Sequence, residues 1–110
     1  MKGDNTDPPA LRITNQFRSS TGFAYDLKAN GERLTLSILS RQATQEPGQW
    51  LVAARLGSAP DTPAIEASGP TRLDALREVG RRWQEQAIEL RLPSFDWDAV
   101  AKALADVRAI

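Results

Sequence analysis

Apolar and polar residues alternate through much of the first half of the chain, which is the period of a β-strand with one buried face. Residues 23–28 and 33–40 show this pattern most regularly, and they flank the dipeptide Asn30-Gly31. Asn-Gly is typical of a two-residue hairpin turn, in which both loop positions have positive φ. The pattern therefore predicts an antiparallel hairpin.

The register of this hairpin follows from the turn. With Asn30 and Gly31 as the loop, apolar residues of the two strands face each other on one side of the sheet. The predicted pairs are Phe23 with Ile38, Tyr25 with Leu36, and Leu27 with Leu34. Polar and small residues, such as the pair Asp26 and Thr35, fall on the other side. Turn chemistry and hydrophobic patterning thus indicate the same register.

Three further segments have the composition of strands. Residues 50–56 and 64–68 follow the hairpin, and residues 11–18 precede it. The pattern leaves open whether residues 11–18 join the sheet.

The face that Trp50 occupies is also open. A tight hairpin at Pro47-Gly48 would place Trp50 and Val52 on the other face of the sheet from the apolar residues of the preceding strand. A bulge or a longer loop would restore them to the apolar face. In the alternative register, Leu51 and Ala53 point to the core and Trp50 lies outside.

The second half of the chain changes to the period of a helix. Residues 71–90 carry an apolar stripe at three- and four-residue spacing, formed by Leu73, Leu76, Gly80, Trp83, Ala87 and Leu90. Thr71 is the predicted N-cap, with Asp74 three residues later. A second helix begins after Ser94 or Asp96, and its stripe is Trp97, Val100, Leu104 and Val107.

Glycine in a helix interior is costly, about 1 kcal/mol relative to alanine. Gly80 lies on the apolar stripe one turn before Trp83. We therefore expect Gly80 to permit a close approach of the helix to the sheet, with Trp83 filling the adjacent space.

These elements predict an α+β fold, an antiparallel sheet of four or five short strands followed by two helices packed on one face. We expect residues 10–110 to form a single domain and the polar residues 1–9 to form a disordered leader. The size of the chain, 110 residues, suits one domain.

Composition excludes several kinds of chemistry. The chain has no cysteine and no histidine, so disulfides, Cys/His zinc sites and histidine-dependent nucleophilic catalysis are excluded. The pairs Asp96/Asp98 and Glu85/Glu89 are better explained by helix capping and a solvated face than by catalysis or metal binding. We expect no enzyme activity, catalytic residue, metal or cofactor.

The location of the protein is predicted by default. No apolar run approaches the length of a membrane span, and the first residues lack the apolar region of a signal peptide. We therefore expect a cytoplasmic protein without a membrane partner.

The polar side of the hairpin is the candidate binding surface. Lys28 and Arg33 face each other there, and Arg41 and Arg55 are expected nearby. Basic groups on an open sheet can contact the phosphates of a single strand, while Tyr25 or Trp50 could stack on bases if exposed. An ordinary solvated face is the simpler interpretation, because 14 basic residues balance 14 acidic ones.

The stretch "FAYDLKANGERLTLSI" resembles the first two strands of PUR-type repeats, the purine-rich-element-binding family. The matching residues are Tyr25, Asp26, Leu27, Lys28, Asn30 and Arg33. The resemblance implies four antiparallel strands and a long helix, an architecture shared with Whirly single-strand binders and often paired into a dimer. The chain departs from that pattern in its additional first strand, its second helix and its neutral charge.

Two functions therefore remain under consideration. The first is a non-catalytic module that binds single-stranded DNA or RNA on its sheet face. The second is a protein-interaction or self-assembly module, for example a homodimer. A steep salt dependence of binding would favour the first, and an apolar patch buried between chains would favour the second.

Overall fold

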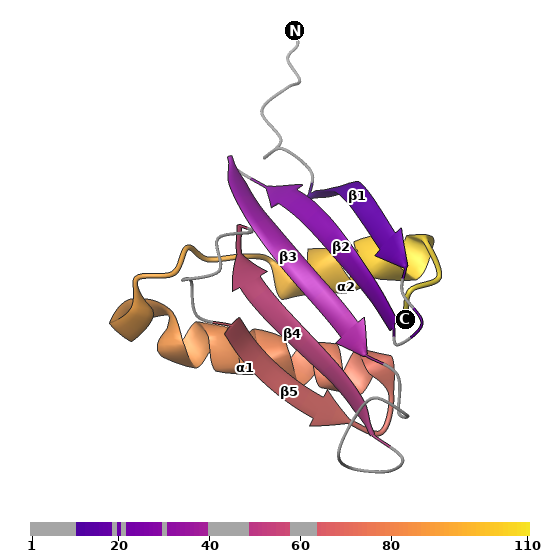
Figure 1. The fold of residues 1–110 in the computed structure, drawn as a ribbon. Helices are drawn as coiled ribbons and strands as arrows, with labels where there is room; N and C mark the ends of the chain where they lie inside the picture. Colours follow the sequence, from indigo (N-terminus) through magenta and orange to yellow (C-terminus); the bar gives the residue numbers. More distant parts are fainter. Residues whose placement is uncertain (1–10, 19, 21, 30, 40–48, 58–63) are drawn as a thin grey trace, which may run out of the picture.

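The computed structural model describes residues 11–18, 20, 22–29, 31–39, 49–57 and 64–110. It contains one five-stranded antiparallel sheet followed by two helices, which confirms the predicted α+β class (Figure 1). The elements are β1 (Arg12–Arg18), β2 (Gly22–Ala29), β3 (Glu32–Leu39), β4 (Trp50–Leu56), β5 (Ala64–Gly69), α1 (Arg72–Leu90) and α2 (Trp97–Asp106). The strands lie in the sheet in the same order as in the chain. The predicted leader falls outside the described residues.

The central hairpin has the predicted register. The three apolar pairs between β2 and β3 form as expected, from Phe23 with Ile38 to Leu27 with Leu34. Gly31 has a φ of 80°, as the turn requires, while Asn30 falls outside the described residues. The apolar side chains on this side of the hairpin form the centre of the core.

The register of β4 settles the face of Trp50. Val52 pairs with Ile38 and Ala54 with Leu36, so Val52 and Ala54 share the core face of β3. Trp50, two residues before Val52, packs against the core on the same side. The alternative with Leu51 and Ala53 in the core is therefore wrong. The connecting residues 40–48, which include Arg41, are not among those described.

The segment before the hairpin does join the sheet. β1 pairs with β2 as an edge strand, and its register shifts by one residue between Ile13 and Asn15. This β-bulge reverses the faces of the residues that follow it. Phe17 consequently pairs with Ala24, on the face opposite to the core.

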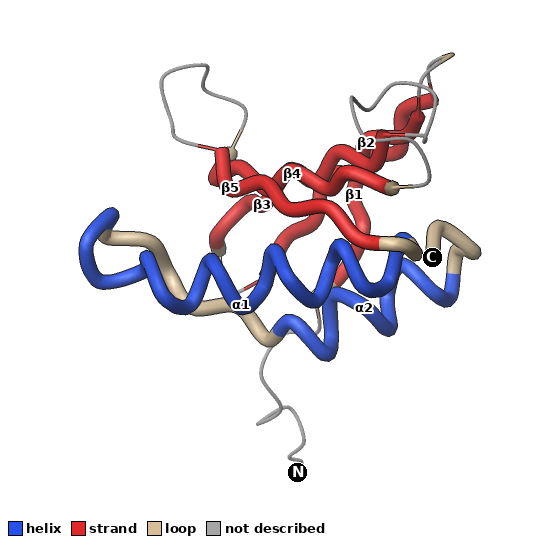
Figure 2. Tube along the Cα trace, turned by 90° about the horizontal axis from the view of Figure 1, so that it is seen from below, coloured by secondary structure: helices blue, strands red, loops and turns tan. Residues whose placement is uncertain are grey.

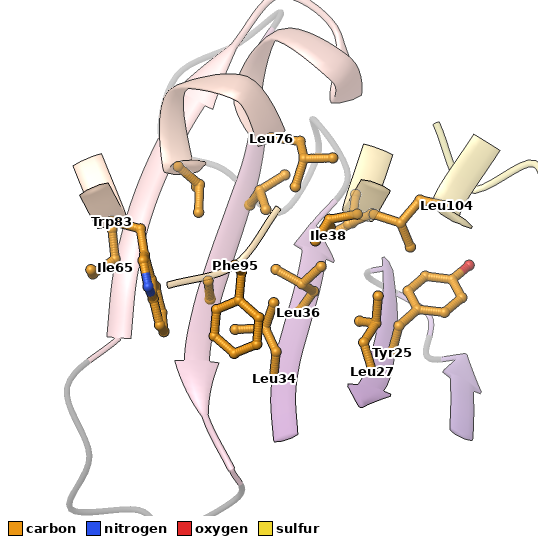
Figure 3. Packing of buried hydrophobic residues seen from close by; sticks show 14 of the residues in the cluster. Tyr25, Leu27, Leu34, Leu36, Ile38, Ile65, Leu76, Trp83, Phe95 and Leu104 are labelled. Atoms are coloured by element: carbon orange, nitrogen blue, oxygen red, sulfur yellow. The ribbon is translucent and has the colours of Figure 1, made fainter. Parts of the chain in front are cut away.

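Both helices lie on one side of the sheet (Figure 2). The hydroxyl oxygen of Thr71 accepts a hydrogen bond from the Asp74 backbone N–H at 3.0 Å, which confirms the predicted N-cap of α1. Asp96 caps α2 by accepting hydrogen bonds from the backbone N–H groups of Asp98 and Ala99. Figure 3 shows the resulting core between helices and sheet, in which Trp83 is fully buried.

Gly80 is buried, but the expected reason for it is wrong. A Cβ atom at this position would lie 2.8 Å from Cγ of Trp97. The close neighbour is therefore the first residue of α2 and not the sheet. Trp97 in turn packs against Trp83, with ring centroids 5.6 Å apart. Gly80 thus allows α2 to settle against α1, where glycine is tolerated because its missing side chain makes room for an indole.

Candidate nucleic-acid interface

The sheet has one face that neither helix covers, here called the open face (Figure 2). Cross-strand pairing places residues of all five strands on it. Its described residues include Arg12, Asn15, Phe17, Ala24, Asp26, Lys28, Arg33, Thr35, Ser37, Ala53, Arg55 and Glu66. The polar side of the hairpin, singled out from the sequence, is the middle of this face.

Basic side chains form a row across one end of the open face. Arg12 pairs with Lys28, and Lys28 pairs with Arg33, so the row spans β1, β2 and β3. All three residues are exposed. Lys28 and Arg33 were expected here. Arg12 was not, because it belongs to this row only if β1 pairs with β2, which the sequence left open.

Asp26 lies beneath the surface of this face, with only 5% of its area exposed. One carboxylate oxygen accepts a hydrogen bond from the Thr35 hydroxyl at 3.0 Å, and the other from the Asn15 amide at 3.4 Å. Arg33 approaches the same carboxylate at 3.7 Å. Asp26 therefore organises the centre of the face, and it offsets part of the charge of Arg33.

Arg55 lies in the next row and lines a small cavity of about 200 Å³. Its Nε atom is buried and has no hydrogen-bond partner among the described residues. The hydroxyl-bearing residues Thr35 and Ser37 line the same cavity. The Thr35 hydroxyl lies 2.8 Å from the Gly57 carbonyl oxygen as well as 3.0 Å from Asp26, and its single hydrogen can serve one of them at a time. The cavity is thus bordered by a guanidinium group and by hydroxyl groups.

The two aromatic residues proposed for stacking do not lie on the open face. Tyr25 is 5% exposed and belongs to the core, because its register partners Leu36 and Gln16 are on the helix side. Trp50 is also on the helix side, where the Arg72 guanidinium lies 5.0 Å from its ring centroid. The prediction that Tyr25 or Trp50 could stack on bases is therefore wrong, because both residues lie on the helix-covered side of the sheet.

Phe17 is the aromatic residue that the open face does expose. Its exposed fraction is 56%, which is high for a large apolar side chain. Phe17 is an even number of residues from Ile13, so a regular strand would place both on one side, and only the bulge in β1 brings Phe17 to the open face. Phe17 lies about 13 Å from the basic row along the strand direction, because its partner Ala24 is separated by that distance from Lys28 on β2.

One member of each acidic pair considered for chemistry has a structural role. Asp96 caps α2, and Glu85 forms an ion pair with Arg81 on the surface of α1. The hydrogen bond from Arg81, with a further contribution from Arg82, lowers the pKa of Glu78 to about 2. No cluster of acidic residues that could hold a metal ion occurs within the described part of the chain. Among the same residues, neither helix has the length and apolar character needed to cross a bilayer.

Comparison of the chain with protein-family models, with curated proteins and with solved structures found no significant match.

Proposed function

We propose that the protein is a small non-catalytic binding module whose open face binds single-stranded nucleic acid. The observation that carries the proposal is the row formed by Arg12, Lys28 and Arg33 on a sheet face without a covering helix. Phosphates dominate the affinity of proteins for nucleic acid, and Lys and Arg are the side chains that contact them. A row of three therefore supplies the first requirement of such a surface.

Arg55 adds a second place for a phosphate. Its guanidinium charge borders the cavity, so an anionic oxygen bound there would be attracted to it. Ser37 and Thr35 offer hydroxyl groups beside it. The cavity volume of about 200 Å³ suits a single phosphate group and not a whole nucleotide.

Phe17 provides the stacking surface that the basic row lacks. Single-strand binders combine a basic groove with aromatic side chains, because every base has a face that can stack. Phe17 lies on the same face as the basic row and is exposed. The resemblance of the hairpin to PUR-type repeats supports the same proposal.

The proposal is tested by fluorescence anisotropy with a labelled oligothymidylate and a labelled oligouridylate at several salt concentrations. Single strands give a logarithmic salt slope of about 0.7 for each phosphate contacted, so three or four contacts predict a slope of about 2–3. Lys28→Gln should weaken binding and reduce the slope by about 0.7. Phe17→Ala should weaken binding by about 1–3 kcal/mol with an unchanged slope, because stacking releases no counterion.

Lys102→Gln is the matched control. Lys102 is an exposed lysine on α2, on the helix side of the molecule. Its replacement should leave both affinity and slope unchanged. Equal effects of Lys28→Gln and Lys102→Gln, or no binding by the unaltered protein at about 100 μM, the weak end of ordinary non-specific affinity, would refute the proposal.

A second copy of the chain is the alternative occupant of the open face. The central row across β2, β3 and β4 consists of the small residues Ala24, Ser37 and Ala53, so another flat surface can approach closely. Light scattering during size-exclusion chromatography distinguishes the two. A dimer that Ala53→Arg dissociates, together with no strand binding, would assign the face to self-association.

A further inference from the structure

A separate pocket lies on the helix side of the sheet, at the edge formed by β1. Its volume is about 360 Å³. β1 contributes Gln16 and Arg18, and Phe17 at the strand edge also borders it. β2 contributes Phe23 and Tyr25, and Val107 and Arg108 close it from the end of α2. The end of α2 and β1 are far apart in the sequence, but they border the same pocket (Figure 1).

The pocket combines two guanidinium groups with apolar walls. Among the described residues that line it, Arg18 and Arg108 are charged and none is acidic. Arg18 lies over the ring of Phe23, with its Cζ atom 5.4 Å from the ring centroid. Neither arginine forms an ion pair within the described residues. Within the described part of the chain, the pocket therefore carries two guanidinium groups without an ion-pair partner.

Arg108 occupies a backbone position that normally favours glycine. Its φ is 61°, and it is the residue after the C-cap Val107, a position where a left-handed residue often ends a helix. The turn is closed by hydrogen bonds from Arg108 N–H to the Ala105 carbonyl oxygen at 2.9 Å and from Ala109 N–H to that of Leu104 at 2.8 Å. Glycine would suit this backbone better, so the side chain of Arg108 is not needed for the turn.

Arg91 shows that the backbone position alone does not mark a site. It follows α1 with a φ of 56° and the same kind of cap. The described lining of the pocket includes Arg108 and not Arg91. The two arginines therefore form a natural pair for comparison, since they share a conformation and differ in their surroundings.

We propose that this pocket binds a small phosphate monoester with an apolar or aromatic body, of about the size of a mononucleotide. Two guanidinium groups match the charge of a phosphate monoester, and their planar donor forks suit its oxygens. Phe23, Tyr25 and Val107 supply apolar surface for the body of the ligand. The volume lies at the lower end of the range for small-molecule sites, so the part of the ligand held in the pocket is about the size of a mononucleotide.

The experiment is a titration of the full chain followed by amide NMR, with AMP, adenosine, phenyl phosphate and inorganic phosphate as probes. AMP and phenyl phosphate should bind and shift the signals of residues 16–18 and 107–108. Adenosine should bind much more weakly, because it lacks the phosphate. No binding of either phosphate monoester at about 1 mM would overturn the proposal.

Variants test whether Arg18 and Arg108 carry the binding. Arg18→Gln and Arg108→Gly should each weaken AMP binding by about tenfold or more, the loss expected for a charge-assisted hydrogen bond. Arg91→Gly is the matched control and should leave AMP binding unchanged. Arg108→Gly should also retain the fold, because glycine suits the left-handed conformation. Equal losses with Arg91→Gly and Arg108→Gly would overturn the assignment.

Two further arms identify the source of the phosphate and separate this pocket from the open face. If the ligand is a strand end, a 5′-phosphorylated oligonucleotide should bind more tightly than its unphosphorylated form, and Arg108→Gly should remove the difference. If the ligand is a free small molecule, AMP should bind and 5′-phosphorylation of the oligonucleotide should change nothing. Lys28→Gln should leave AMP binding unchanged, so failure of the open-face proposal leaves this one standing.

Discussion

Replacing Gly80 by alanine adds one methyl group where α1 contacts α2. The new Cβ atom would lie 2.8 Å from Cγ of Trp97 and 3.0 Å from its Cβ and Cδ2 atoms. Ordinary carbon contacts are about 3.5–4.0 Å. Trp97 cannot simply swing aside, because its ring also packs against Trp83 and Phe95, with centroids at 5.6 and 6.2 Å. The extra methyl group must therefore displace α2 or distort its first turn.

The size of the effect follows from two opposing contributions. Overpacking of this kind costs about 1–3 kcal/mol, and replacing glycine by alanine in a helix stabilises it by about 1 kcal/mol. Gly80→Ala should therefore lower the free energy of unfolding by about 0–2 kcal/mol. In a protein that already carries Trp97→Gly, which has no Cβ atom at residue 97, the clash is absent. There, Gly80→Ala should raise the free energy of unfolding by about 1 kcal/mol.

The measurement is a double-mutant cycle of four proteins unfolded in urea and followed by circular dichroism. Circular dichroism is preferred because removing Trp97 alters the fluorescence signal. The effect of Gly80→Ala should differ between the two backgrounds by about 1–3 kcal/mol, with a similar urea slope throughout. If the two values agree within about 0.5 kcal/mol, residues 80 and 97 are not coupled, and the explanation of Gly80 is wrong.

Three other outcomes follow from local geometry. Gly31→Val should lower the free energy of unfolding by at least about 1 kcal/mol, because φ at this position is 80°; an unchanged urea midpoint would contradict the turn assignment. Thr71→Ala should cost about 1 kcal/mol by removing the acceptor for the Asp74 N–H, while Thr71→Ser should preserve most of the stability in the same urea assay. Glu78 has a pKa lowered to about 2 in the folded protein, against 4.5 ordinarily, so its stabilising contribution is complete above about pH 4.5 and is lost as the pH falls towards 2. Carbon-13 NMR of its carboxyl group should show the low pKa, and Arg81→Gln should raise it; an ordinary pKa in the unaltered protein would refute the ion-pair interpretation.

The hairpin shows which features could be predicted from the sequence. The Asn-Gly turn fixes the pairing of its flanking residues, and the apolar pattern independently requires the same pairing. All pairs from Phe23 with Ile38 to Leu27 with Leu34 occur as predicted. The face of Trp50 could not be derived in this way, because the intervening segment 40–48 is too long for a turn rule to fix the register of β4.

Gly80 marks a different limit. The helical stripe correctly indicates that this residue is buried, since periodicity identifies the face of a helix that points inward. It does not identify what lies opposite. α1 packs on the sheet and also against α2, so a buried glycine can serve either contact. Trp97 becomes the neighbour of Gly80 because residues 91–96 turn the chain back towards α1. These residues have no periodic pattern from which their path could be predicted.

The bulge in β1 decides the composition of both proposed sites. In the register that Ile13 and Leu27 begin, Phe17 would pair with Phe23 on the helix side. After the shift at residue 14, Phe17 instead pairs with Ala24 on the open face, and Arg18 pairs with Phe23 beside the pocket. An edge strand can hold such a bulge because no strand pairs with its outer side. One additional residue therefore exchanges an aromatic side chain and a guanidinium between the two faces, and the alternation of residues 11–18 gives no sign of it. The proposed stacking surface of the open face and the contribution of Arg18 to the pocket both depend on this single irregularity of the backbone.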